Sequence, residues 1–174
     1  SAASDVYKRQ VANRLPRKDG GIILTHLLNR RGRIEIEVTV IRLAEDRYYL
    51  VCAAFFEQRL LDHLAQNGGA GLDVVNRSTG WAALALQGPR SRDVLSQVTD
   101  AALDNAGFRW LSAQQITIAG HDVLALRLSY AGELGWELHG PAEAMPDVYD
   151  ALWTAGADHG LSLIHISEPT RHCL

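Results

Sequence analysis

The stretch Arg33-Ile-Glu-Ile-Glu-Val-Thr-Val-Ile-Arg-Leu43 alternates apolar and polar side chains over most of its length. In an extended chain its aliphatic side chains share one face: Ile34, Ile36, Val38 and Val40. The opposite face carries Glu35, Glu37 and Thr39. Because successive side chains of a strand point to opposite faces, this pattern predicts a half-buried β-strand.

Strand signals continue on both sides of this stretch. Gly21–Asn29 precedes it across a basic turn at residues 30–32, and Tyr48–Ala53 follows it after a polar connection. Short connections between runs of β-branched and aromatic residues are typical of neighbouring antiparallel strands. We therefore predict an antiparallel meander over residues 21–53.

The hydrophobic period then changes to that of a helix. Within Phe55–Asn67 the apolar residues recur at helical spacing, and Gly68-Gly69 supplies a stop. A second helix is predicted after Pro89, and a third between Pro141 and Gly160 with four large apolar residues on one side: Met145, Val148, Leu152 and Trp153.

The remaining segments read as further strands. They are predicted at Leu72–Asn76, Trp81–Gln87, Gln114–Ala119, Asp122–Tyr130 and Glu137–His139, with a hairpin turn at Gly120-His121. Strands in groups, with helices between the groups, predict an α+β fold in which helices pack on one face of antiparallel sheets.

Both ends of the chain read as translated sequencing adapter. Ser1-Ala-Ala-Ser-Asp-Val-Tyr-Lys-Arg-Gln10 matches one adapter, and the run that begins at Leu161 matches the opposite one. Segments of this origin are excluded from fold reasoning. We therefore expect residues 1–10 and 161–174 to be non-native, and residues 11–160 to be an internal fragment of one domain.

Composition excludes several classes of partner. Setting the two ends aside changes the net formal charge only from −3 to −4, and the arginines are scattered, so a nucleic acid is not an expected partner. No apolar run approaches the roughly 20 residues that span a bilayer. The fragment has a single thiol, Cys52, and no His or Cys pair at ligand spacing, so neither a disulfide nor a metal site is predicted.

Chemistry is concentrated in Arg127-Leu-Ser-Tyr-Ala-Gly-Glu-Leu-Gly-Trp-Glu-Leu138. Gly132 and Gly135 permit a tight backbone around Glu133, while Tyr130 and Trp136 offer flat faces for a planar ligand. A pterin ring has a pair of adjacent N–H donors, which an ionised carboxylate accepts in bidentate fashion. The alternative is that Glu133 is a solvated turn residue and Trp136 is packed in the core.

Three segments together resemble one family, the aminomethyltransferase fold of the glycine cleavage T-protein. They are Asn29–Val40, Leu84-Ala-Leu-Gln-Gly-Pro-Arg-Ser-Arg-Asp-Val-Leu95 and Tyr130-Ala-Gly-Glu-Leu-Gly-Trp-Glu-Leu138. The same fold forms the C-terminal half of dimethylglycine and sarcosine dehydrogenases. Trp136 and the run at residues 39–43 are more similar to this dehydrogenase branch. The resemblance as a whole implies an incomplete folate-binding domain.

The resemblance implies roles for four residues. Glu133 matches the glutamate that holds the pterin, and Tyr130 and Arg127 match the residues beside it. The family's catalytic acid lies in a Gly-Gly-x-x-x-Asp segment; here Gly32-Arg33 replaces the glycine pair and Glu37 takes the place of the aspartate. Glu37 would orient or deprotonate the attacking nitrogen, although it reaches one methylene farther than aspartate.

The implied reaction moves a one-carbon unit from an oxidised N-methyl amine onto tetrahydrofolate, giving 5,10-methylenetetrahydrofolate. FAD would belong to an upstream flavin domain in cis, and the isolated fragment is expected to be inactive. A bacterial cytoplasm or a mitochondrial matrix would suit the resemblance. Two alternatives are a free glycine-cleavage T-protein and a non-enzymatic folate-binding protein of the same fold; the motif at residues 128–133 argues against the second.

Overall fold

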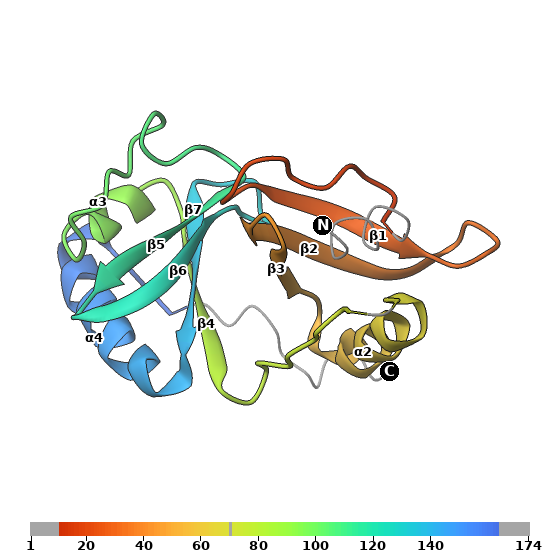
Figure 1. The fold of residues 1–174 in the computed structure, drawn as a ribbon. Coiled ribbons are helices and arrows are strands. Elements are labelled where there is room, and N and C mark those ends of the chain that lie inside the picture. The colour runs from red at the N-terminus through yellow and green to blue at the C-terminus, as the bar shows by residue number, and fades with distance from the viewer. Residues whose placement is uncertain (1–10, 70, 164–174) are drawn as a thin grey trace, which may run out of the picture.

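The computed structural model describes residues 11–69 and 71–163, whose strands form two antiparallel sheets (Figure 1). Sheet A has the order β1 (Ile22–Leu28), β2 (Ile34–Ala44) and β3 (Arg47–Val51). Sheet B has the order β4 (Trp81–Gln87), β7 (Gly135–Pro141), β6 (His121–Arg127) and β5 (Ser112–Ile118). The predicted meander and the α+β class are confirmed.

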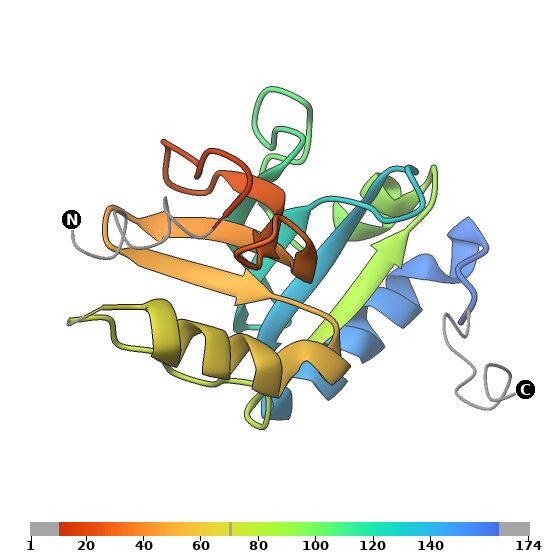
Figure 2. The ribbon, with the colours of Figure 1, turned by 90° about the vertical axis from the view of Figure 1, so that its right-hand side faces the viewer.

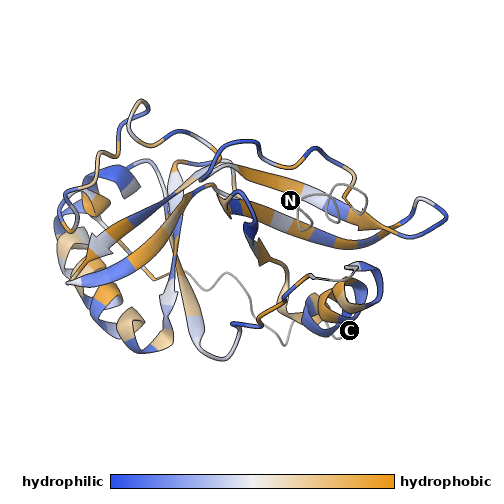
Figure 3. Cartoon of the chain, viewed as in Figure 1, coloured by the Kyte–Doolittle hydropathy of each residue, from blue (hydrophilic) through white to orange (hydrophobic). Residues whose placement is uncertain are grey.

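The helices lie on the outer faces of the two sheets. They are α2 (Glu57–Asn67), α3 (Ser91–Leu95) and α4 (Met145–Gly156), with short 3₁₀ turns at Ala54–Phe56, Ala142–Ala144 and Ala157–His159. Figure 2 shows α4 along one face of sheet B and α2 beside sheet A. Hydrophobic residues gather in the strands and along α4, whereas the β1–β2 connection is hydrophilic (Figure 3). Each sheet therefore has its own apolar layer.

The alternation that predicted β2 holds from residue 36 to residue 40 on the face that α2 covers. It does not hold at the start of the strand, where the β1–β2 register shifts: Ile34 is 62% exposed, and Glu35 pairs with Arg59 of α2. Ile36, Val38 and Val40 are buried on the α2 face together with Leu60 and Leu64 of α2. At about 25 cal/mol per Å² of apolar surface, each such side chain contributes roughly 1.5–3 kcal/mol. The helical period of residues 56–64 is therefore what closes sheet A on one side.

The pattern of β2 changes at Ile41, which is buried on the other face. Ile41 belongs to an apolar cluster between the two sheets, together with Ile22 of β1 and three residues of sheet B: Ala113, Leu124 and Leu126. The backbones also meet here, because the Ala113 N–H donates to the Gly20 carbonyl at 2.7 Å. A Cβ on Gly20 would lie 2.5 Å from the Ala113 carbonyl oxygen, so glycine is required at this crossing.

Three local expectations differ from the structure. Leu72–Asn76 forms no strand, because no neighbouring strand pairs with it. The β5–β6 turn is Ala119-Gly120, one residue earlier than predicted, since Ile118 pairs with His121. Trp153 is exposed and stacks on Tyr149, outside the apolar stripe of α4.

The predicted adapter segments fall mainly outside the described residues. This applies to residues 1–10 and to residues 164–174, while residues 161–163 are described and form no strand. Within the described ranges, none of the helices combines the length and the apolar character needed to cross a bilayer.

Candidate functional site

Glu37, the predicted catalytic acid, lies on an open part of sheet A. It stands opposite His26 of β1, and its Oε2 is 3.2 Å from His26 Nε2. Strand alternation places Glu37 on the same face as Ile41, which packs against sheet B. Four residues of strand separate the two, about 13 Å at 3.3 Å per residue. Glu37 therefore faces the angle between the sheets, beyond their junction.

Tyr130 and Glu133 lie in the turn between β6 and β7. Gly132 has φ of +78°, a backbone conformation that suits glycine. The side chain of Tyr130 is fully exposed, and Glu133 is also exposed, above Gly88 at the end of β4. Among the described residues Glu133 makes no hydrogen bond or ion pair. Both side chains are accessible to a ligand, but neither is held in place.

Arg127 and Trp136 lie instead in the core. The Arg127 guanidinium donates to the Phe108 carbonyl and, at 2.7 Å, to Asn105 Oδ1, and it lies 5.6 Å from the centre of the fully buried Trp136 ring. Burial and the neighbouring Arg92 lower the pKa of Arg127. The expectation that Trp136 offers a flat face to a ligand was therefore wrong, because α3 and α4 cover that face.

Strand alternation explains why the motif divides between two faces. Leu126 of β6 is in register with Glu137 of β7, so both point to the side of sheet B that meets sheet A. Arg127 and Trp136 are each one residue away and point to the helices. The structure thus separates Arg127 from Glu37 and places Glu137 on the face toward sheet A.

A cleft of about 570 Å³ opens between β3, α2, residues 73–78 and the start of β4. This volume is within the range of small-molecule sites, which runs from roughly 300 to 1,000 Å³. We call it the inter-sheet cleft. Its aromatic and ionisable lining comes from both sheets and from the segment before β4, and it includes Tyr49, Arg77, Trp81 and His139.

A chain of hydrogen bonds crosses from sheet A to sheet B at this cleft. The Tyr49 hydroxyl is 3.1 Å from Nδ1 of His139, and Nε2 of His139 is 3.1 Å from Oε2 of Glu137. His139 is buried, with 4% of its surface exposed. The ring of Tyr49 also lies 5.7 Å from that of Trp81, above which Arg77 is placed.

Burial raises the pKa of Tyr49 above its usual 10.0, and the charge of Glu137 acts in the same direction, while Arg77 opposes the shift. A phenol keeps its proton at neutral pH, and the raised pKa acts in the same direction. Tyr49 is therefore a hydrogen-bond donor at the cleft.

Small side chains form the floor beside these polar groups. Ala83 and Ala85 of β4 are exposed and are in register with His139 and Glu137. The Glu137 side chain is partly open, at 29% exposure. A flat ligand could lie over the alanines with its edge toward the Glu137 carboxylate, because no large side chain of β4 stands in between.

Sequence reasoning missed Glu137, His139 and Tyr49 as candidates. A signal for the first two was present, since Trp136-Glu137-Leu138-His139 alternates apolar and polar residues and so places the acid and the imidazole on one face. Tyr49 had no local signal. It reaches His139, which is 90 residues away, only through the packing of the two sheets.

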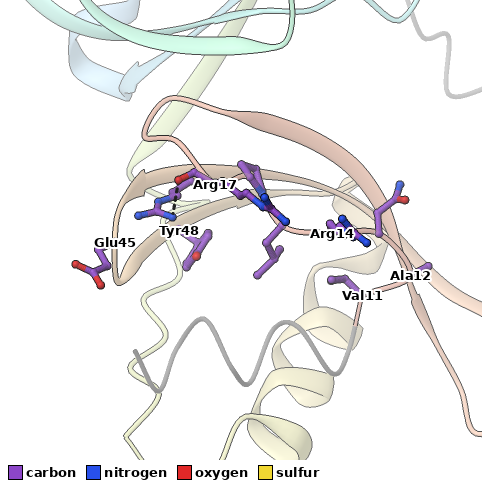
Figure 4. A pocket seen from close by; sticks show the side chains of 10 residues that line it. Val11, Ala12, Arg14, Arg17, Glu45 and Tyr48 are labelled. Carbon is purple, nitrogen blue, oxygen red and sulfur yellow. Dashed lines mark hydrogen bonds between the residues drawn. The ribbon is translucent and has the colours of Figure 1, made fainter.

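A larger hollow of about 830 Å³ lies under the segment that precedes β1. Arg14 and Arg17 come from that segment, and Glu45 and Tyr48 from the β2–β3 hairpin (Figure 4). None of the four predicted site residues lines it. In the part of the chain that the structure describes, no group of three or more His, Cys, Asp or Glu residues could hold a metal ion.

Known proteins similar to this chain were found at the level of family, sequence and fold. The family model described as the GCVT N-terminal domain matches residues 1–167. Mitochondrial sarcosine dehydrogenase of Mus musculus is 38% identical over 161 residues, which cover 83% of this chain and 18% of that protein. Aminomethyltransferase of Halothermothrix orenii is 33% identical over 160 residues, which cover 91% of this chain and 44% of that protein.

A solved structure has the same fold. It is the heterotetrameric sarcosine oxidase from Corynebacterium sp. U-96 in complex with pyrrole 2-carboxylate, with a TM-score of 0.72 and 21% identity over 95% of this chain and 78% of that one. At this identity the likeness shows the fold alone, and it confirms the predicted class. The chain spans less than half the length of either sequence relative named above.

Proposed function

We propose that this chain, which belongs to the GCVT N-terminal domain family, is the folate-binding part of a longer enzyme. That enzyme would resemble sarcosine and dimethylglycine dehydrogenases and would pass a one-carbon unit from an oxidised N-methyl amine to tetrahydrofolate. The observation that carries the proposal is the partly open Glu137 carboxylate, which is hydrogen-bonded to His139 of the inter-sheet cleft and lies beside Ala85 of β4.

The residues present suit a reduced pterin. An ionised carboxylate accepts two parallel N–H donors, and the pterin edge presents such a pair. The floor of Ala83 and Ala85 gives the flat ring a surface without steric conflict. Of the two acids in the motif, Glu137 is better placed than Glu133, because it is already oriented by a hydrogen bond. We therefore propose Glu137 as the main acceptor, with Glu133 and Tyr130 at the rim.

Glu37 is proposed as the acid that orients or deprotonates the attacking folate nitrogen. Its position supports this role, since it lies on the face of sheet A that turns toward Glu137. Its partner His26 leaves it more than half exposed, with 56% of its side-chain surface open. A carboxylate that remains solvated can exchange a proton with a ligand that binds across the angle.

The donor of the carbon unit is proposed to be an upstream flavin domain in the same polypeptide. When FAD is bound there, it would supply the oxidation of the N-methyl amine, and this chain would bind the folate acceptor. The product would be 5,10-methylenetetrahydrofolate. A bacterial cytoplasm or a mitochondrial matrix is the proposed location, since one named relative is mitochondrial and the other bacterial.

A free aminomethyltransferase is the second candidate function. It is favoured by the match to the Halothermothrix orenii protein, which covers 91% of this chain. The two candidates share the folate site and differ in the carbon donor. Assaying the longer protein for N-methyl amine oxidation would separate them, because a free aminomethyltransferase would show none.

The folate site is tested by a matched pair of substitutions. In the longer protein that we propose contains this domain, Glu137→Gln should weaken folinic acid binding about 10- to 100-fold, because a charge-assisted pair of hydrogen bonds is lost. Glu133→Gln should change binding less than about threefold. Equilibrium dialysis measures both. A larger loss with Glu133→Gln would return the main role to Glu133, and no binding by the wild-type protein would refute the proposed function.

A further inference from the structure

His139 makes hydrogen bonds with both ring nitrogens while almost fully buried. It sits on β7 between Ala83 of β4 and Leu124 of β6, and it reaches Tyr49 on the other sheet. The Tyr49 and His139 rings meet edge to face, with centroids 5.7 Å apart and an interplanar angle of 86°. The imidazole is therefore fixed in both position and orientation.

For a neutral His139, hydrogen-bond chemistry selects one arrangement of protons along the hydrogen bonds from Tyr49 to Glu137. An ionised Glu137 carboxylate can only accept, so Nε2 of a neutral His139 must carry the proton and donate it. Nδ1 then has a free lone pair, which accepts the proton of the Tyr49 hydroxyl. With the other tautomer, Nε2 and the carboxylate would face each other as two acceptors. The charges that act on the Tyr49 hydroxyl are those of Glu137 and Arg77.

This arrangement leaves one carboxylate oxygen available. Oε2 of Glu137 accepts from His139, and no hydrogen bond to Oε1 is found among the described residues. The bond to Oε2 restricts the rotation of the carboxylate, so Oε1 and the second lone pair of Oε2 keep a narrow range of directions. A side chain held in this way matches a ligand that has two adjacent donors.

We propose that His139, which lines the inter-sheet cleft, is a positioning residue: it orients the neighbouring Glu137 carboxylate so that this carboxylate selects ligands with a paired N–H and amino edge. This inference rests on the proposed folate site and adds to it the source of its selectivity. Positioning through a second hydrogen bond is a common way to fix a binding group, since an unrestrained carboxylate would rotate among several rotamers.

The test uses two amide substitutions that divide the functions of the imidazole. His139→Gln keeps an N–H donor near the Nε2 position, facing Glu137. His139→Asn keeps an amide near the Nδ1 position, facing Tyr49, and loses the donor to Glu137. Both are polar, of moderate size and suited to the same strand, so a general packing defect should affect them alike.

The readout is the ratio of affinities for folinic acid and for its 2-desamino-2-methyl analogue, measured by equilibrium dialysis on the longer protein. Wild type and His139→Gln should prefer folinic acid by the same ratio within about threefold, while His139→Asn should lower that ratio about tenfold. A packing defect would weaken both ligands equally and leave the ratio unchanged.

The outcomes separate the two proposals. Equal ratios in wild type, His139→Gln and His139→Asn would overturn the role of His139 while leaving folate binding in place. Absence of folinic acid binding by wild type would instead refute the folate site itself. If His139→Asn fails to fold, His139→Ala takes its place, because it also removes the donor to Glu137 and should lower the ratio about tenfold. Tyr49→Phe keeps that donor and should retain the wild-type ratio, so equal ratios in both would again overturn the role of His139.

Discussion

Arg127 carries its charge inside the core between sheet B and its helices. Its guanidinium binds the Phe108 carbonyl and Asn105, and both Arg127 and Arg92 lie against the Trp136 ring. No acid pairs with Arg127 among the described residues, so hydrogen bonds and the aromatic face compensate for its burial. Arg127 therefore stabilises the loop before β5, which contains Asn105 and Phe108.

Replacing Arg127 tests this structural role. Arg127→Met should lower the free energy of unfolding by about 1–3 kcal/mol, because the Phe108 carbonyl loses its donor. The exposed Arg109→Met should stay within about 0.5 kcal/mol of wild type. Urea denaturation measures both. Folinic acid binding by folded Arg127→Met should remain within about twofold, and a tenfold loss would show that Arg127 contacts the cofactor after all.

Glu133 and Glu137 show how far position alone can distinguish two identical side chains. They are four residues apart in one motif, yet one lies in a solvated turn and the other beside a buried imidazole. The sequence resemblance pointed to the first, whereas strand alternation and the opposite sheet favour the second. The binding role of each carboxylate therefore depends on whether a neighbouring side chain, such as His139, holds it in place.

The turn of the β5–β6 hairpin lies one residue earlier than the sequence predicts. Ala119 and Gly120 have φ of 51° and 80°, the pattern of a two-residue turn that matches the twist of antiparallel strands. Glycine adopts this conformation freely, but alanine does so at a cost of about 1–2 kcal/mol. The sequence showed that a turn lay here, but the cross-strand pairing of Ile118 with His121 set its position.

Relieving this strain should stabilise the hairpin. Ala119→Asn should raise the free energy of unfolding by about 0.5–1 kcal/mol, because asparagine tolerates the left-handed region. Gly120→Ala, the matched change at the next position, should lower it by about 1 kcal/mol or more. Thermal unfolding followed by circular dichroism measures the two shifts. Destabilisation by Ala119→Asn would mean that the turn is not of this type.

At the scale of the whole molecule, several apolar surfaces have no cover within the described residues. Leu28 and Ile34 are exposed at the outer end of the β1–β2 hairpin, and Leu24 is exposed on the open face of β1. The edge strand β4 also presents Ala82, Ala83 and Ala85 to solvent. Uncovered apolar patches and free strand edges favour association.

We therefore expect this chain to self-associate when it is expressed alone. Size-exclusion chromatography with light scattering should show oligomers at micromolar concentration, and the double substitution L28T/I34T should reduce them, because both side chains are exposed and threonine suits strands. A wild-type chain that runs as a monomer and unfolds cooperatively would contradict this expectation.

The sequence by itself determined the elements, because strand and helix periods are local: the alternation of residues 36–40 and the helical spacing of residues 56–64 form as predicted, whereas the alternation breaks at Ile34 and Glu35. It also pointed to the motif at residues 130–138, which contains Glu137. Only the tertiary structure decided which motif residues share a face and which partners they meet. Tyr49 and His139 come together because Ile41 of β2 packs against Leu124 and Leu126 of sheet B, a contact between distant segments that no local period encodes.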